Sequence, residues 1–298
     1  MATTSDTVPL DKIKQLIAEP NQKIRLFDYV KEKSDVLAAQ ITEEFFPLND
    51  PWDSTELATR LEKYENLSSE LISIFSLIGY WGTTDHLPVI SIPMKVFLLS
   101  NGNDPRRNNW SSLRWYPMLL ITYAIGIGAI ASKNYPVLYG YFQPNYRNQS
   151  HLSNRMRFSL ALEEGLENTR QSFRSLPGRE RQHFPLNEYL FDLFGKKWND
   201  VLFLGLDYED IFDRFEIFYT LQFAHDRERT SGHVWGPPGR FGWKYSNRAD
   251  SDPFRLLSEE ASIHKESWAP LRAGFFDGSY ERFEKLLAQL ERIIENIH

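Results

Sequence analysis

Apolar residues recur along most of this chain at the three- and four-residue spacing that marks one face of a helix. The longest runs predict helices over residues 24–45, 57–78, 207–225 and 280–297. The last run is the clearest, because charged residues separate its apolar positions and Ser279 precedes it as an N-cap. The first run is expected to bury its apolar stripe, which comprises Ile24, Phe27, Val30, Leu37, Ile41 and Phe45.

Strand signals are confined to two short segments. Residues 89–92 predict one short strand, and residues 241–245 predict part of a small β-ribbon. Strands and helices do not alternate as they do in doubly wound enzymes. The pattern therefore predicts an all-α fold, a multi-helix globular packing with at most a small β-ribbon. We expect one α-helical domain over 1–298; the alternative is two lobes, 8–145 and 154–298.

The segment 116–131, YPMLLITYAIGIGAIA, carries no formal charge. A helix that is apolar on all sides lies either in a protein core or in a membrane, and spanning a bilayer takes about 20 such residues. Because this run is shorter, we expect it to be the buried central helix of the fold. A membrane-associated helical protein is the alternative interpretation.

Charge is distributed unevenly along the chain, whose net charge is −6. Residues 1–70 carry fourteen Asp and Glu against eight Lys and Arg, whereas residues 101–182 carry eleven Lys and Arg against five Asp and Glu. The basic middle region is therefore a candidate contact surface for an anionic ligand, nucleic acid or an acidic partner. The alternative is that its cations face the acidic N-terminal helices or solvent. The candidate anion-binding residues are Arg106, Arg107, Arg147, Arg155, Arg157 and Arg240.

The helix over 207–225 places Glu209, Asp213 and Glu216 on one face. Such carboxylates could hold a divalent metal, but any amphipathic helix has a solvated acidic face, and matching ligands from other helices are lacking. We assign no metal. Phosphate-loop, dinucleotide-binding, nucleophile-elbow and zinc-protease motifs are also missing, so we expect no cofactor. The absence of cysteine excludes thiolate chemistry and fits a cytoplasmic location.

One pair of residues resembles the motif of helical ribonucleases of the HEPN type, in which an arginine is followed four to six residues later by a histidine. Arg227 and His233 have five residues between them, and Glu228 is the polar residue that follows the arginine. In such a site the cation would hold the scissile phosphate while imidazole moves protons. These residues are the candidate catalytic pair if the protein is an RNA-directed nuclease.

The segment 232–244, GHVWGPPGRFGWK, combines glycines with cations, a combination that can cradle a phosphate. Its two consecutive prolines favour an extended backbone, and no strand-to-helix context frames it as a nucleotide site. We expect an ordered connector in which His233 and Arg240 are the groups still able to do chemistry. Its aromatic residues, Trp235, Phe241 and Trp243, are expected to pack on the core.

Two stretches, 112–142 (SLRWYPMLLITYAIGIGAIASKNYPVLYGYF) and 208–228 (YEDIFDRFEIFYTLQFAHDRE), resemble an accessory helical region of bacterial multidomain proteins with antiphage or stress roles. The resemblance implies a non-enzymatic sensing, scaffolding or assembly role, with a protein partner or an upstream effector subunit. It brings no catalytic residues. We therefore expect a helical interaction module, with the nuclease and the membrane-associated protein as alternatives.

Overall fold

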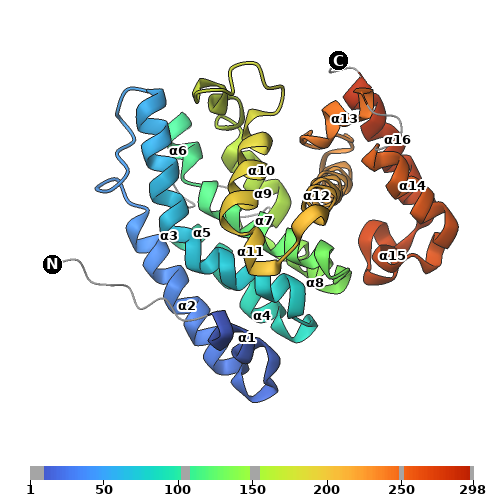
Figure 1. Ribbon diagram of the computed structural model, residues 1–298, viewed down its shortest axis with the longest axis horizontal. Coiled ribbons are helices and arrows are strands. Elements are labelled where there is room, and N and C mark those ends of the chain that lie inside the picture. The colour runs from blue at the N-terminus through green and yellow to red at the C-terminus, as the bar shows by residue number, and fades with distance from the viewer. Residues whose placement is uncertain (1–9, 102–107, 148–154, 248–251, 296–298) are drawn as a thin grey trace.

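The computed structural model describes residues 10–101, 108–147, 155–247 and 252–295, which form an assembly of packed helices. Figure 1 shows the N-terminal helices on one side, the C-terminal helices on the other, and α7 and α12 between them. The all-α prediction is confirmed. The helices of the N-terminal part are α1 (Leu10–Ala18), α2 (Lys23–Gln40), α3 (Ser54–Trp81), α4 (Leu87–Ile90), α5 (Ile92–Asn101), α6 (Asn109–Leu113), α7 (Tyr116–Ala131) and α8 (Tyr135–Phe142).

The second half begins with a small antiparallel ribbon and continues with helices of mixed length. Strands β1 (Asn145–Arg147) and β2 (Arg155–Arg157) pair between α8 and α9, not at either position where the sequence predicted strands. The helices that follow are α9 (Phe158–Leu166), α10 (Pro185–Lys197), α11 (Asn199–Leu202), α12 (Tyr208–Ser231), α13 (Phe241–Asn247), α14 (Pro253–His264), α15 (Ala269–Ala273) and α16 (Tyr280–Glu295).

Helix α7 is the centre of the molecule, as predicted. Every residue from Tyr116 to Ile130 is buried, and the helix packs against α3 on one side and against α12 and α9 on others. By length and composition the stretch Asn109–Ala131 could cross a membrane, but 94% of its apolar window is buried inside the fold. Its apolar surface is therefore accounted for by the surrounding helices.

Helices α3 and α7 cross at very short range because glycines face each other's backbones. A Cβ atom built on Gly79 of α3 would lie 2.3 Å from the carbonyl oxygen of Ile125, and one on Gly128 would lie 2.3 Å from that of Ser76. No side chain fits at either position, so the two backbones pack directly together. The apolar core extends without interruption from Ile13 to Ile294, across both of the lobes considered in the sequence.

The sequence pattern located α3, α12 and α16 well, but only half of the stripe predicted for residues 24–45 is buried: Val30, Leu37 and Ile41 face the core. The buried positions of α2 include Leu26, Val30, Ser34 and Leu37, whereas Ile24 is 75% and Phe45 is 55% exposed. Phe27 is also exposed. Ser34 breaks the apolar stripe in the sequence, and its hydroxyl group donates to the carbonyl oxygen of Val30. A polar residue that satisfies itself on its own helix is thus part of the buried face.

The two strands predicted at residues 89–92 and 241–245 are helical instead. Residues 89–90 end α4, Ser91 caps it and Ile92 begins α5; Pro88 and Pro93 lie in the first turns of these helices, where proline favours a helix. Residues 241–245 begin α13, whose Phe241 is completely buried. At the C-terminal helix the prediction is confirmed, including the cap: the Ser279 hydroxyl accepts from the N–H of Arg282 at 3.2 Å.

Candidate functional site

The acidic face of α12 is buried, contrary to its interpretation as a solvated face. Asp213 and Glu216 are each 1% exposed, and the side chain of Glu209 is about half exposed. The chain reverses after α12 and returns over this face, which brings Arg240 and Lys244 onto the carboxylates. We call these five residues the α12 ionic cluster. Arg240 and Lys244 of the 232–244 segment therefore neutralise carboxylates on the acidic face of α12. The acidic face and the segment, which are separate features in the sequence, form one cluster.

Arg240 is the hub of the α12 ionic cluster. Its Nη1 lies 3.0 Å from Oδ1 of Asp213, its Nη2 lies 3.3 Å from Oε1 of Glu209, and its Nε lies 3.5 Å from Oε2 of Glu188. The guanidinium also stacks on the ring of Phe191, 3.7 Å from its centroid. Planar stacking combined with forked donation is the geometry for which arginine is suited.

Lys244 completes the cluster with ion pairs to Asp213 and to Glu209, the latter 2.6 Å from its Nζ. The hydrogen bond with Lys244 is the main cause that holds the pKa of Glu209 below its ordinary value. Burial raises the pKa of Asp213, and the two nearby cations oppose that rise. The cluster joins α12 to α13, and among the described residues no group of three or more His, Asp and Glu is arranged to hold a metal.

Glu216 is a buried acceptor. Its Oε1 accepts from the Tyr123 hydroxyl at 2.8 Å and from Nδ2 of Asn187 at 2.6 Å, and its Oε2 accepts from the backbone N–H of Arg240 at 2.8 Å. Burial raises the pKa of Glu216 to about 7. These three hydrogen bonds hold α7, α10 and the 232–244 connector together. Glu216 lines neither of the pockets described below.

The connector packs closely on α12, and of the three aromatic residues expected on the core Phe241 is buried whereas Trp235 is exposed. The Thr220 hydroxyl donates to the carbonyl oxygen of Pro237 at 2.7 Å. A Cβ atom on Gly236 would lie 2.6 Å from the Thr220 carbonyl oxygen, and one on Gly239 would lie 2.4 Å from Oε2 of Glu216. The glycines thus let the backbone approach the helix. Phe241 is buried, Trp243 donates to Glu188, and Trp235 stays 39% exposed against Phe223.

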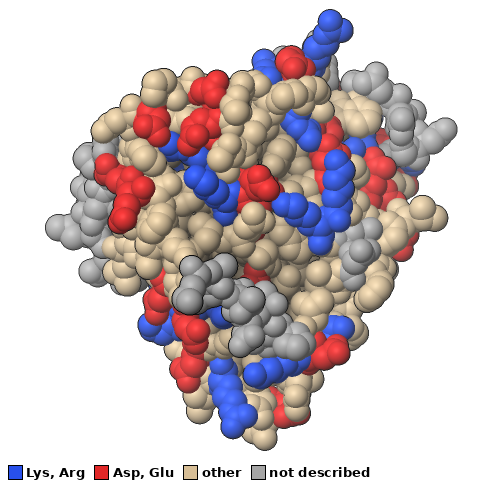
Figure 2. Space-filling model, turned by 60° about the vertical axis from the view of Figure 1, so that its left-hand side comes forward, with Lys and Arg blue, Asp and Glu red and all other residues tan. Residues whose placement is uncertain are grey.

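The structure describes the side chains of two of the six candidate anion-binding arginines, Arg157 and Arg240. Arg106 and Arg107 lie outside the described residues. Arg147 and Arg155 are register partners in the ribbon, and their side chains also lie outside what the structure describes. Figure 2 shows cations and acids intermixed on the face that it presents.

The other two arginines have partners inside the protein. Arg157 donates to the side-chain oxygen of Gln143 at 2.9 Å, and its Nε lies 3.9 Å from Oδ1 of Asp226. The side chain of Arg240 is 6% exposed and contacts carboxylates. Arg240 therefore offers no exposed face to an external anion.

The candidate nuclease pair is separated by the end of α12. Arg227 lies on the helix, half-buried, with its guanidinium over the Trp235 ring at 5.2 Å. Gly232 ends the helix in the left-handed conformation at φ 74°, and His233 follows it in an exposed position. Within the described part of the chain no hydrogen bond or ion pair joins the two, and neither lines a pocket described here. The nuclease assignment stays a prediction.

An exposed apolar groove lies at the other side of the molecule, where α1 and α11 both pack against α3. Its volume is about 420 Å³. We call it the Trp81–Phe203 groove. It is lined by Lys14 and Ala18 of α1, Tyr80 and Trp81 of α3, Val201 and Leu202 of α11, and Phe203. Trp81 is 60% and Phe203 is 84% exposed, so large apolar side chains face solvent here.

The segment between α11 and α12 projects beside this groove and forms an apolar tip, residues 203–206. Phe203 has a left-handed backbone, φ 53°, which is uncommon for a bulky residue. Leu206 at the end of the tip is fully exposed. No periodic pattern marks this surface in the sequence, because FLGL resembles any apolar turn and Trp81 lies at the end of a helical apolar stripe.

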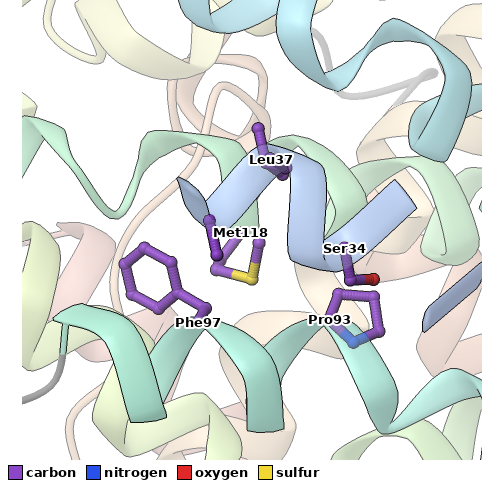
Figure 3. Close-up of a pocket in the computed structure, with 6 residues that line it drawn as sticks. Ser34, Leu37, Pro93, Phe97 and Met118 are labelled. Carbon is purple, nitrogen blue, oxygen red and sulfur yellow. The ribbon is translucent and has the colours of Figure 1, made fainter. Parts of the chain in front are cut away.

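A second hollow is smaller and lies inside the N-terminal helices. It has no room for a water molecule and is walled by Ser34 and Leu37 of α2 and Pro93 and Phe97 of α5, with Met118 of α7 between the two helices (Figure 3). Ala38 is its sixth lining residue. Because the Ser34 hydroxyl group donates to its own helix, the hollow presents apolar walls only. It is a seam in helix packing and not a polar binding site.

No protein-family model, curated protein or solved structure matches the chain. The candidate site is therefore judged on its own geometry. Of the features above, the α12 ionic cluster is buried and internally neutralised, whereas the Trp81–Phe203 groove is open, apolar and projecting. The groove is the feature that an external molecule can reach.

Proposed function

We propose that this protein is a non-enzymatic helical interaction module, a scaffold or sensor in a bacterial multi-protein defence or stress system. The Trp81–Phe203 groove is its protein-docking surface. The observation that carries the proposal is the exposure of Trp81, Phe203 and Leu206 around one groove. Contiguous exposed apolar surface on a globular protein marks an interaction site, and aromatic side chains are enriched at such sites.

The rest of the structure is consistent with a passive, well-ordered module. The buried charged groups of the α12 ionic cluster, Glu216 among them, are engaged with groups of the protein itself. The resemblance of 112–142 and 208–228 to accessory helical regions supports the same role. Both stretches contain core helices: α7 packs against the groove-bearing helix α3, and α12 packs against α7, and neither lines the groove itself.

Site-specific photocrosslinking in the native cell tests the docking surface. A photoreactive phenylalanine analogue replaces Phe203 in one variant and Ile263 in a control, because Ile263 of α14 is 77% exposed but lies outside the groove. We expect protein adducts from position 203 and none of matching yield from position 263. Equal yields at both positions, or no adduct at either, would contradict the proposal.

A second contact surface is favoured by the register of the ribbon. The register places Arg147 and Arg155 at opposed positions of β1 and β2, so two cationic residues stand on adjacent strands of the ribbon. We propose that the ribbon binds an anionic partner. Binding of single-stranded RNA should weaken with salt and should be lost in Arg147→Ser/Arg155→Ser. The control, Arg255→Ser/Lys285→Ser on exposed C-terminal helices, should retain it.

A further inference from the structure

We infer that the occupant of the Trp81–Phe203 groove is a second copy of this chain, bound across a twofold axis. The inference rests on the proposed function, because it names the partner for the same surface. The groove and the apolar tip, residues 203–206, lie side by side. A twofold axis places the tip of each copy over the groove of the other, so one patch serves as both projection and recess.

The amount of apolar surface fits a dimer interface. Trp81 is 60% and Phe203 is 84% exposed, so their rings together present about 300 Å² to solvent. Leu206 is fully exposed and adds to this area. A standard interface buries about 800 Å² on each partner, of which somewhat more than half is apolar. Groove and tip thus supply most of the apolar surface that one side of a stable dimer requires.

Helix α1 carries charges of both signs, which allow it to pair with α1 of a second copy in the proposed dimer. Asp11, Lys14 and Ala18 share one helix face, of which Lys14 and Ala18 line the groove. Lys14 Nζ lies 3.7 Å from Asp11 Oδ1, and both side chains are exposed. When two copies of α1 approach in antiparallel orientation, Lys14 of each faces the partner's Asp11. Two symmetric ion pairs then border the apolar contact and fix its orientation.

The backbone of Phe203 is consistent with the same contact. A left-handed conformation costs free energy at a residue with a Cβ atom, and glycine would adopt it without that cost. Within one copy the Phe203 ring makes few contacts that could offset this cost, because it lies mostly in solvent. Insertion into the groove of a second copy buries the ring.

Sedimentation velocity on the full chain over a range of concentrations tests the dimer. We expect reversible association, and we expect Phe203→Ser and Trp81→Ser each to raise the dimer dissociation constant by about 30-fold or more, as for interface hot spots. Ile263→Ser is the control and should leave the constant unchanged, because this exposed residue lies outside the groove. Far-UV circular dichroism verifies that each variant is folded.

A charge exchange on α1 tests the antiparallel orientation. Lys14→Asp alone and Asp11→Lys alone should each weaken the dimer, because each places like charges opposite each other across the axis. The double variant Asp11→Lys/Lys14→Asp should restore association close to that of the parent chain. Restoration is specific to an interface in which these two positions face each other, so two weakened singles with an equally weakened double overturn this orientation.

The outcomes separate the dimer from the docking surface. A chain that stays monomeric at all concentrations, or a dimer that Phe203→Ser and Trp81→Ser do not weaken, overturns the second copy as occupant. If position 203 then still forms crosslinks to a different protein, the proposed function stands and the partner is that protein. If position 203 forms no crosslink to any protein, the proposed function fails as well.

Discussion

The backbone N–H of Arg240 donates to Oε2 of Glu216 at 2.8 Å, and Glu216 is 1% exposed. A buried carboxylate of α12 thus fixes the point at which the 232–244 connector turns into α13. The same carboxylate accepts from Tyr123 of α7 and Asn187 of α10, so three segments distant in sequence meet on one side chain. This arrangement makes stability depend on the ionisation of Glu216.

The first prediction concerns pH. Burial raises the pKa of Glu216 from 4.5 to about 7, so between these values the folded chain binds a proton that the unfolded chain has released. The free energy of unfolding should therefore fall as pH rises through this window, by on the order of 3 kcal/mol, and level off above it. In Glu216→Gln this contribution should vanish, as urea unfolding at pH 5, 6, 7 and 8 would show. Parallel curves for the two proteins would contradict it.

The second prediction concerns the buried ion pairs. Asp213→Ala removes the buried carboxylate shared by Arg240 and Lys244 and leaves them only the half-exposed Glu209 as a shared partner, which should cost about 3–5 kcal/mol of unfolding free energy. Glu209→Ala is the matched control, since that side chain is 46% exposed and its loss should cost much less. Urea unfolding compares them, and equal costs would show that burial does not set the strength of the cluster.

The third prediction concerns the crossing of α3 and α7. Gly128→Ala places a methyl group against the Ser76 carbonyl oxygen, so the helices must separate, and the chain should lose about 1–3 kcal/mol or more. Gly195→Ala is the control within a helix: its Cβ atom would meet only the Tyr208 ring at 3.1 Å. Thermal unfolding should show a large fall in Tm for the first variant and a small change for the second.

The fourth prediction concerns the strained residue of the groove. Phe203→Gly removes the cost of a left-handed backbone at a bulky residue, and it should raise the stability of the monomer by about 1 kcal/mol. Phe203→Ala retains the Cβ atom and should give no such gain. Unfolding at low protein concentration isolates the monomer. A destabilised glycine variant would mean that the Phe203 ring contributes to the fold of a single copy.

The fifth prediction concerns the candidate nuclease pair. For a non-enzymatic module we expect no RNA cleavage by the parent chain above that of a protein-free blank, and no change in His233→Ala or Arg227→Ala. Gel analysis of a labelled single-stranded RNA gives the answer. Cleavage by the parent that both substitutions abolish would establish the nuclease instead, with His233 as the exposed acid–base group.

Helical periodicity was sufficient to predict the elements whose apolar stripes are unbroken. Helices α3 and α16 and the buried α7 follow from it directly. The face of α2 was predicted only in part, because its buried stripe contains Ser34 and its exposed side carries Ile24 and Phe27. The assignment of apolar residues to the core and polar residues to the surface fails where a polar residue faces inward or an apolar one faces solvent.

The candidate sites depended on contacts that no local pattern contains. The pattern of α12 alone predicts that Asp213 faces solvent. It is buried because Arg240 and Lys244, which follow much later in the chain, pack over it and neutralise its charge. The groove likewise has no sequence signature. The exposure of Trp81 and Phe203 depends on how α1 and α11 are placed on α3. Tertiary placement, not composition, distinguishes these positions from ordinary core residues.

Hydroxyl-radical footprinting of Trp81 tests the docking surface most directly. Its oxidation rate is measured in the native cell and in the purified chain at high dilution, with Trp235 as the internal reference because that residue is also exposed but lies outside the groove. A docked partner should protect Trp81 several-fold in the cell and leave Trp235 unchanged. Equal oxidation of Trp81 in the two settings would show that the groove stays open and is not a docking surface.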